Sequence, residues 1–205
     1  MGLDSLLCSQ PPHMKGCNIV NKEVLNTVFG SCPVDMSDED ILDAMKSIII
    51  WSWVGSFIGI AAVAFFNHAI VDKTDLVLII GSFGASAVLI YGAIRSPLAQ
   101  PRNLTGGHVI SAIIGVTIYK LFPTHLMLAA PVAVATSIAA MHATKTLHPP
   151  GGATALIAVI GSQKIHNLGY FYVLIPGAVG PVIMLAVALL VNNIPKNRRY
   201  PEFWL

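Results

Sequence analysis

The sequence predicts an all-α fold, a polytopic membrane bundle of about six helices, two of them short, and two observations carry that prediction. First, 55% of the 205 residues are hydrophobic and 11% are charged, with a mean hydropathy of +0.71. Soluble domains average about 25% charged residues, so this composition is typical of a membrane protein. Second, four segments of at least nineteen residues contain no Asp, Glu, Lys or Arg. A helix needs roughly 20 residues to cross a hydrocarbon core, so each segment can span.

The four charge-free segments are residues 47–71, 76–94, 121–144 and 165–195. Two shorter apolar segments, residues 106–119 and 152–162, lie before the third and the fourth of them. An 11-residue helix rises only about 16 Å. The second short segment therefore crosses only with the help of flanking residues or within a thinned, protein-lined region.

Basic residues favour the topology in which both short segments cross the membrane. Lys and Arg near the ends of spans accumulate on the cytoplasmic or equivalent side. With six crossings, seven basic residues share one face and three lie on the other, whereas a re-entrant hairpin at 152–162 gives four against six. The seven are Lys46, Arg95, Arg102, Lys145, Lys196, Arg198 and Arg199, and the three are Lys73, Lys120 and Lys164. We predict six spans with both termini on the positive side.

The chain divides into a membrane domain and two polar ends. Residues 1–46 form a polar N-terminal extension with short helices, since they hold seven of the ten acidic residues and all three cysteines. The transmembrane domain is expected over 47–195, and residues 196–205 form a basic tail. Ser37, followed by three acidic residues, is typical of a helix N-terminus, so a helix is predicted to run from there into the first span. The cysteine spacing fits neither a metal site nor a disulfide framework.

Two stretches share one pattern, SPLAQPRNLTGGH at residues 96–108 and KTLHPPGG at residues 145–152, and we name them the first and second motif loops. Each follows an apolar helix, contains basic residues and prolines, and runs through a Gly–Gly pair into a short apolar helix. We interpret the likeness as a parallel internal repeat, which places both loops on the same side. Short or interrupted segments in corresponding positions point to a transporter binding site.

Prolines in these loops predict where helices begin. Proline at the first helical turn loses no hydrogen bond that a helix start could make, and its fixed φ suits a helix. Pro149 and Pro150 are therefore predicted to open the fifth helix. Pro97 and Pro101 are the structural prolines of the first motif loop.

The glycine pairs, Gly106–Gly107 and Gly151–Gly152, are predicted at the first turns of the helices that follow. There the unpaired N–H groups and the positive end of the helix dipole face outward, so each helix start can bind an anion. Glycine also permits close packing of membrane helices. From the sequence, both roles stay open for the two pairs.

Beyond residue 75, the charged residues of the membrane domain are all basic. Residues 76–201 contain no Asp or Glu but eight Lys or Arg, whereas cation channels and many cation carriers hold their ion with membrane carboxylates. Arg95, Arg102 and Lys145 lie in or beside the motif loops. Each alone fits ordinary charge flanking a span, and together with the helix starts they form a candidate anion site.

His108 and His148 also lie in the motif loops, and His142 lies three residues before Lys145. His108 and His148 could titrate near neutral pH and couple anion movement to protons, or they could simply hold the loops together by hydrogen bonds. No Cys or carboxylate accompanies the three histidines, and their spacing is not that of paired metal ligands. We predict no metal and no other cofactor.

The sequence His148-Pro149-Pro150, with SPLAQPRNLTGGH and LHPPGGATAL, resembles the HPP family of integral membrane proteins over about residues 47–193. The resemblance implies a compact helical membrane domain found in bacteria and plastids, with members implicated in nitrite transport across the chloroplast envelope. It extends to no part of the N-terminal extension.

Two functions of different classes follow. The first is transport of a small inorganic anion, nitrite or nitrate, bound between the motif loops. The candidate anion-binding residues are Arg95, Arg102, Gly106, Gly107, His108, Lys145, His148, Gly151 and Gly152. The second is a non-transporting structural or accessory membrane subunit, assembled as a homo-oligomer or with other subunits of a larger organellar or bacterial complex.

Other functional classes find no support in the sequence. No Ser-His-Asp set, HExxH, GxSxG or nucleotide-binding loop occurs, which argues against an enzyme. The expected surroundings are a lipid bilayer, either an organelle inner membrane (plastid or mitochondrial) or a bacterial inner membrane. No nucleic-acid partner is expected.

Overall fold

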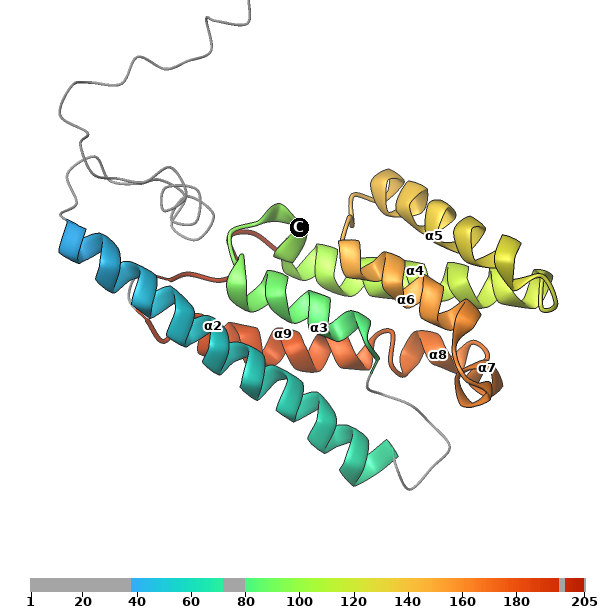
Figure 1. The fold of residues 1–205 in the computed structure, drawn as a ribbon, viewed down its shortest axis with the longest axis horizontal. Coiled ribbons are helices and arrows are strands. Elements are labelled where there is room, and N and C mark those ends of the chain that lie inside the picture. The colour runs from blue at the N-terminus through green and yellow to red at the C-terminus, as the bar shows by residue number, and fades with distance from the viewer. Residues whose placement is uncertain (1–37, 72–79, 196–197, 205) are drawn as a thin grey trace, which may run out of the picture.

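The structure is a computed structural model that describes residues 38–71, 80–195 and 198–204, and every regular element within them is a helix (Figure 1). The predicted all-α class is therefore confirmed. The elements are α2 (Asp38–Phe66) with its π-helical continuation η2 (Asn67–Val71), α3 (Ser82–Ala87) with its π-helical continuation η3 (Val88–Gly92), the 3-10 helix η4 (Pro97–Ala99), α4 (Pro101–Leu121), α5 (Leu126–Ala143), α6 (Pro149–Ile160), α7 (Gln163–Leu168), α8 (Phe171–Leu174) and α9 (Val179–Val191).

Successive long elements run in alternating directions along the bundle. The start of α2, the first motif loop and the end of α9 lie on the left in Figure 1, and the second motif loop lies nearer the middle, in contact with the first. The described residues contain four apolar helical segments long enough to cross a membrane, Leu42–Ala69, Pro101–Leu121, Leu126–Ala143 and Phe171–Val191. Two shorter apolar helices, Ser82–Gly92 and Pro149–Ile160, complete the six. The side of the membrane that each end faces stays a prediction.

The helix bounds correct two of the predicted segments. The segment 106–119 is not a short helix, because α4 begins at Pro101 and extends for 21 residues. The segment 165–195 is not one helix, because it starts within α7 and turns twice before α9. Gly169 has a φ of 52°, in the left-handed region that suits glycine, and Pro176 has no N–H to donate to a helix.

Two other expectations hold. Helix α2 runs without a break from Asp38 through the expected domain boundary at residue 46 and into the first span. Helix α6 begins with Pro149 and Pro150 and has only 12 residues, so it rises about 18 Å and stays shorter than a hydrocarbon core. The short helices predicted within residues 1–37 lie outside the described residues.

Helices α4 and α6 pack closely because small residues line both contact faces. A Cβ added at Gly107 would lie 2.5 Å from the His148 Cβ, and one added at Gly115 would lie 2.7 Å from the Ala155 carbonyl oxygen. A Cβ at Gly151 would lie 2.8 Å from the Gly107 carbonyl oxygen. Close backbone approach of this kind is how membrane helices gain packing energy where burial from water contributes little.

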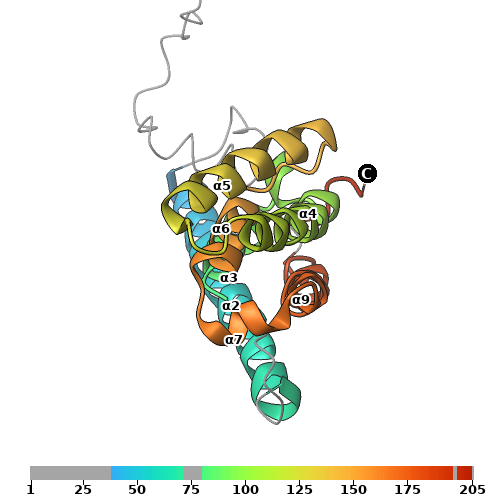
Figure 2. The ribbon, with the colours of Figure 1, turned by 90° about the vertical axis from the view of Figure 1, so that its right-hand side faces the viewer.

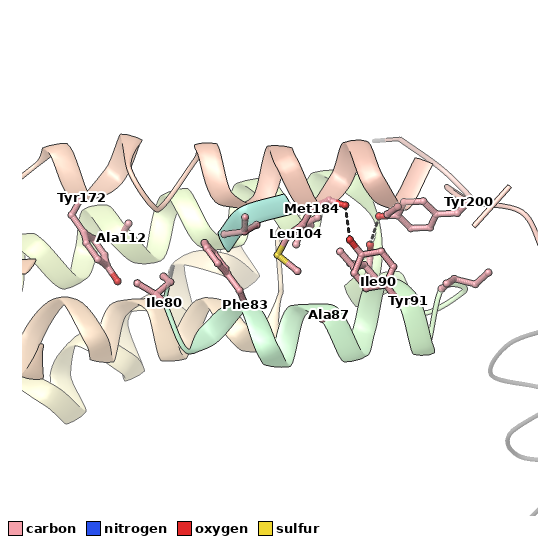
Figure 3. Packing of buried hydrophobic residues seen from close by; sticks show 14 of the residues in the cluster. Ile80, Phe83, Ala87, Ile90, Tyr91, Leu104, Ala112, Tyr172, Met184 and Tyr200 are labelled. Atoms are coloured by element: carbon pink, nitrogen blue, oxygen red, sulfur yellow. Dashed lines mark hydrogen bonds between the residues drawn. The ribbon is translucent and has the colours of Figure 1, made fainter. Parts of the chain in front are cut away.

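The remaining helices enclose this α4–α6 pair. Helix α5 lies on one side of it, and α3, α9 and the slanted α2 lie on the other (Figure 2). Phe83, Ile90 and Met184 are buried between α3, η3 and α9 (Figure 3). The outer face of α2 keeps large apolar side chains exposed, such as Trp53 and Phe57, as expected for a surface that meets lipid.

Candidate functional site: the motif loops and a buried histidine pair

The two motif loops contact each other directly, whereas their shared pattern predicts only that they lie on the same side. The Asn103 side chain donates to the Leu147 carbonyl over 2.8 Å. The Arg102 guanidinium donates from Nη2 to the Thr144 carbonyl over 2.9 Å. Because Thr144 is the C-cap of α5, the positive guanidinium lies against the negative end of that helix.

The second motif loop starts with an unusual backbone at Lys145. Helix α5 ends in a Schellman motif, in which the Thr146 N–H donates to the Met141 carbonyl (2.9 Å) and the Lys145 N–H to that of His142 (3.2 Å). Lys145 occupies its left-handed position with a φ of 56°, the one positive φ outside glycine in the described residues. A residue with a Cβ costs about 1–2 kcal/mol there. The Lys145 side chain is exposed.

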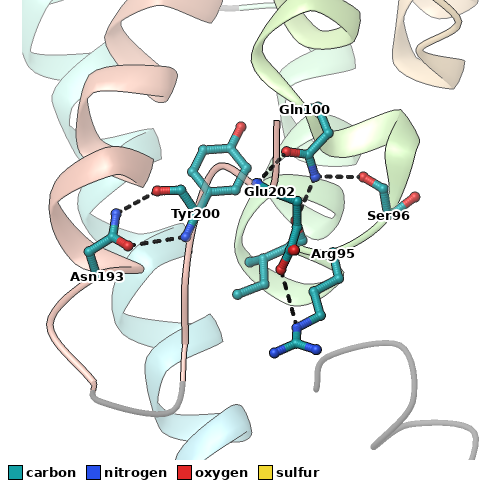
Figure 4. A network of polar contacts seen from close by, with 7 residues as sticks. Arg95, Ser96, Gln100, Asn193, Tyr200 and Glu202 are labelled. Atoms are coloured by element: carbon teal, nitrogen blue, oxygen red, sulfur yellow. Dashed lines mark hydrogen bonds and ion pairs between the residues drawn. The ribbon is translucent and has the colours of Figure 1, made fainter. Parts of the chain in front are cut away.

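The first motif loop is covered by the C-terminal tail (Figure 4). The Glu202 carboxylate lies 3.3 Å from the Arg95 Nε. The Gln100 side chain accepts a bond from the Glu202 backbone N–H (2.9 Å) and donates to the Ile94 carbonyl (2.9 Å). The buried Tyr200 hydroxyl donates to the Ala99 carbonyl over 2.7 Å. The predicted anion ligand Arg95 is therefore paired with a carboxylate of the same chain.

A second arginine anchors the tail to the bundle. The Arg198 Nη2 donates to the Tyr91 carbonyl (2.6 Å) and to the Asn192 side-chain oxygen (3.1 Å). Burial lowers the pKa of Arg198 to about 10, since the charged form loses hydration. The basic tail therefore folds back onto the loop end of the bundle.

The geometry corrects the role predicted for the glycine amides. Gly106 and Gly107 lie in the second turn of α4, where each backbone N–H has a partner within the helix, because that helix starts at Pro101. In α6 the Gly151 N–H donates to the His148 carbonyl over 2.8 Å. Gly107 and Gly151 instead allow helix contact. Gly152 differs, since an added Cβ would meet only Val134, at 3.8 Å.

His108 and His148 are brought together in the interior by one serine. Both rings are fully buried, with centroids 5.1 Å apart. The Ser86 hydroxyl on α3 lies 2.8 Å from the His108 Nε2 and 2.9 Å from the His148 Nε2. The other ring nitrogens are also engaged: His108 Nδ1 lies 2.7 Å from the Thr154 hydroxyl, and His148 Nδ1 lies 2.8 Å from the Leu98 carbonyl.

The network continues through Thr154 on α6. Its hydroxyl is aligned to donate to the Ser82 hydroxyl (3.0 Å) and to the Pro150 carbonyl (3.3 Å). The Tyr172 hydroxyl donates to the Thr154 carbonyl over 2.9 Å. One continuous polar network therefore links α3, α4, α6, α8 and the first motif loop inside an apolar bundle.

Sequence reasoning missed the hydroxyl residues of this network. Ser82 and Ser86 are spaced i, i+4 on an otherwise apolar helix, so they share one face. A polar stripe within a membrane helix faces the bundle interior and signals a functional or structural network. The i, i+4 spacing of the two serines was the sequence signal for a buried polar network. It does not reveal that the partners are histidines from two other segments.

The four ring nitrogens each have a hydrogen-bond partner, so none is presented to a metal ion. Within the described residues, no group of three His, Cys, Asp or Glu side chains is placed to hold one. His142 lies apart from the pair, exposed near the end of α5.

Comparison with known proteins agrees with the helical fold. Residues 43–201 match the family described as HPP, transmembrane region. A transmembrane protein of Dictyostelium discoideum is 46% identical over 159 residues, which cover 75% of this chain and 50% of that protein. A second Dictyostelium discoideum transmembrane protein is 43% identical over 157 residues, 75% of this chain and 55% of that protein.

The chain thus spans about half the length of the curated relatives that it matches. No solved structure matches it significantly. The matched region includes every helix from α3 to α9 and both motif loops. The chain is an integral membrane protein and belongs to the HPP transmembrane family.

Proposed function

We propose that this protein transports a small inorganic anion of the nitrite or nitrate class, and that Arg102 and Lys145 form its first binding site. The observation that carries the proposal is the contact between the Arg102 guanidinium and the carbonyl of Thr144, the residue directly before Lys145 in the chain. Neither cation makes an ion pair with a described residue, whereas Arg95 is paired with Glu202.

The backbone at Lys145 supports a role for its charge. Glycine is the residue that normally occupies the left-handed position of a Schellman motif. Strained residues cluster at functional sites, where the surrounding structure holds them in place. A lysine in this position, with its side chain exposed, places a positive charge at the end of the bundle at a cost in stability.

Cationic side chains also suit the energetics of the task. An anion that leaves water needs compensation for its lost hydration, and charge-assisted hydrogen bonds from Arg or Lys are stronger than neutral ones. The glycine amides do not supply this compensation, because their donors are used within helices. The site therefore differs from the helix-start site that the sequence suggests.

The test is uptake of nitrite, nitrate and chloride into liposomes that contain the purified chain, with and without a pH gradient. Lys145→Met keeps the apolar stem and removes the charge. We expect its half-saturating anion concentration to rise roughly 5- to 150-fold, which corresponds to about 1–3 kcal/mol, and Arg102→Met to behave alike.

Lys164→Met is the matched control, because Lys164 is an exposed lysine at the opposite end of the bundle. Its affinity for anions should match that of the wild type. If Lys145→Met and Arg102→Met bind anions with unchanged affinity, the two cations do not bind the anion and only set the orientation of the protein in the membrane. Absence of any flux in the wild type would favour the non-transporting membrane subunit.

A further inference from the structure

The buried histidine pair has fewer protons than its hydrogen bonds require when the proton of His108 lies on Nδ1. A carbonyl oxygen only accepts, so the His148 Nδ1 carries a proton and donates it to Leu98. We place the His108 proton on Nδ1 as well, because the single Thr154 hydroxyl proton is directed at Ser82 and Pro150, and the His108 Nδ1 then donates to Thr154. A neutral imidazole has one N–H, so both Nε2 atoms are then acceptors.

Ser86 faces both of these acceptors with a single proton. Its hydroxyl can donate to the Nε2 of either His108 or His148, which lie 2.8 and 2.9 Å away. The other nitrogen then meets a lone pair of the same oxygen. An unmade hydrogen bond between buried polar atoms is costly. One additional proton on that nitrogen completes every bond in the network.

From this geometry we propose that His108, Ser86 and His148 form a one-proton relay, and that its proton moves together with the transported anion. When His148 carries the extra proton, its Nε2–H donates to Ser86, and Ser86 donates to the His108 Nε2. Transfer breaks the His148 Nε2–H bond and forms a Ser86 O–H bond. The original Ser86 O–H bond breaks as a His108 Nε2–H bond forms, so one positive charge passes from His148 to His108.

No described group around the relay can neutralise that charge. The titratable or charged groups on the segments around it are Tyr172 on α8, which is hydrogen-bonded to the Thr154 carbonyl, Arg102 on α4, and Lys145 with His142 at the end of α5. The carboxylate of Glu202, at the first motif loop, is paired with Arg95. Helix α3 contributes serines and Phe83, whose ring lies 5.4 Å from that of His108. Carboxylates are absent from residues 76–201 of the sequence.

A bound anion supplies the missing negative charge, and this coupling rests on the proposed function. Linkage is reciprocal, so an anion that stabilises the charged pair raises its proton affinity, and protonation raises anion affinity by the same factor. Anion and proton then cross together with no net charge. The relay itself does not depend on transport, which allows the two ideas to fail separately.

The first experiment follows the ring nitrogens by 15N NMR in the full chain labelled at histidine, in lipid nanodiscs. We expect His108 and His148 to take up one proton between them as pH falls, and added nitrite to shift this uptake to higher pH. Neutral rings at every pH, with the His108 proton on Nε2, would overturn the relay, because the network would then be complete without an added proton.

The second experiment measures proton entry into liposomes during nitrite uptake with an internal pH dye. Ser86→Ala removes the bridging oxygen and should lower the ratio of protons to anions at least about tenfold. His148→Asn keeps a donor for the Leu98 carbonyl but lacks Nε2, and it should have the same effect if Ser86→Ala does not fold. Ser137→Ala is the control, since Ser137 is a buried serine on α5 whose hydroxyl has no hydrogen-bond partner in the described residues.

The outcomes separate the relay from the anion site. Nitrite uptake without proton entry in the wild type would overturn the coupling and leave the proposed function standing. One-proton uptake by NMR without flux of any anion would leave the relay standing and overturn the proposed function. An unchanged proton-to-anion ratio in both Ser86→Ala and His148→Asn would show that protons follow another route.

Discussion

The two motif loops are alike in sequence and unlike in their surroundings. The first is covered by the C-terminal tail, in which Glu202 pairs with Arg95 and bonds to Gln100, while Tyr200 donates to the Ala99 carbonyl. The second has no hydrogen bond or ion pair with residues 198–204 of the tail, and its lysine is exposed on left-handed backbone. The cation that precedes the first motif loop, Arg95, is therefore paired with a carboxylate, whereas Lys145 at the start of the second loop makes no ion pair within the described residues.

This difference shows that a repeated pattern need not repeat its function. The glycine pairs give a second instance, since the first pair lies in the second turn of α4 and the second pair opens α6. Within each pair, the environment of the individual glycine decides its role. Substitutions at three positions, with matched controls, test how the different surroundings of the two loops affect stability and anion binding.

The largest effect is expected at Gly107. A Cβ there would lie 2.5 Å from the His148 Cβ and 3.0 Å from the Thr146 carbonyl oxygen, so α4 and α6 must separate. Gly107→Val should destabilise the folded protein by about 3 kcal/mol or more, and Gly107→Ala by about 1–3 kcal/mol. Unfolding in mixed micelles, followed by loss of helical signal or monodispersity, measures both.

Gly152 is the matched control in the second motif loop, because an added Cβ meets only Val134 at an ordinary 3.8 Å. Gly152→Ala should be neutral or stabilise by up to about 1 kcal/mol, since alanine is the better helix former. Equal loss of stability at Gly107 and Gly152 would contradict the packing account of the first pair.

An intermediate effect is expected where the tail covers the first motif loop. Tyr200→Phe leaves the buried Ala99 carbonyl without its 2.7 Å partner, which should cost about 1–2 kcal/mol. Tyr170→Phe is the control, because that hydroxyl contacts Thr117 at an exposed position. If Tyr200→Phe unfolds at the same denaturant concentration as the wild type, the tail does not hold this loop.

The smallest effect is expected at Lys145. Lys145→Gly removes the left-handed strain and should stabilise the protein by about 0.5–1 kcal/mol, less than the full strain because glycine also gains freedom in the unfolded chain. Lys145→Ala keeps the Cβ and removes the charge, so it should gain nothing. If Lys145→Gly is more stable but binds anions more weakly, the lysine serves anion binding at the expense of the stability of the fold. A gain in Lys145→Ala equal to that in Lys145→Gly would assign the effect to charge rather than to backbone.

The sequence alone was sufficient for the helical class, the placement of both motif loops at the same end of the bundle and the start of α6 at Pro149. Each of these rests on a local pattern: apolar segments of spanning length, a repeated loop, and proline at a first turn. The start of α4 was misplaced by five residues, because the polar stretch after Pro101 resembles a loop. Inside the fold, Arg102 and Asn103 find carbonyl partners more than 40 residues away and remain helical.

Local patterns determined which residues form helices and where positive charge is concentrated. This is because apolar segments and prolines influence the backbone only of residues close to them in the sequence. Only the tertiary structure decided which charges are paired and which two histidines contact the same serine. Ser86 meets His108 and His148 across 22 and 62 residues, and Tyr200 reaches Ala99 across 101. Contacts at such separations depend on how whole helices pack, and helix packing depends on small residues such as Gly107, whose neighbours no local pattern specifies.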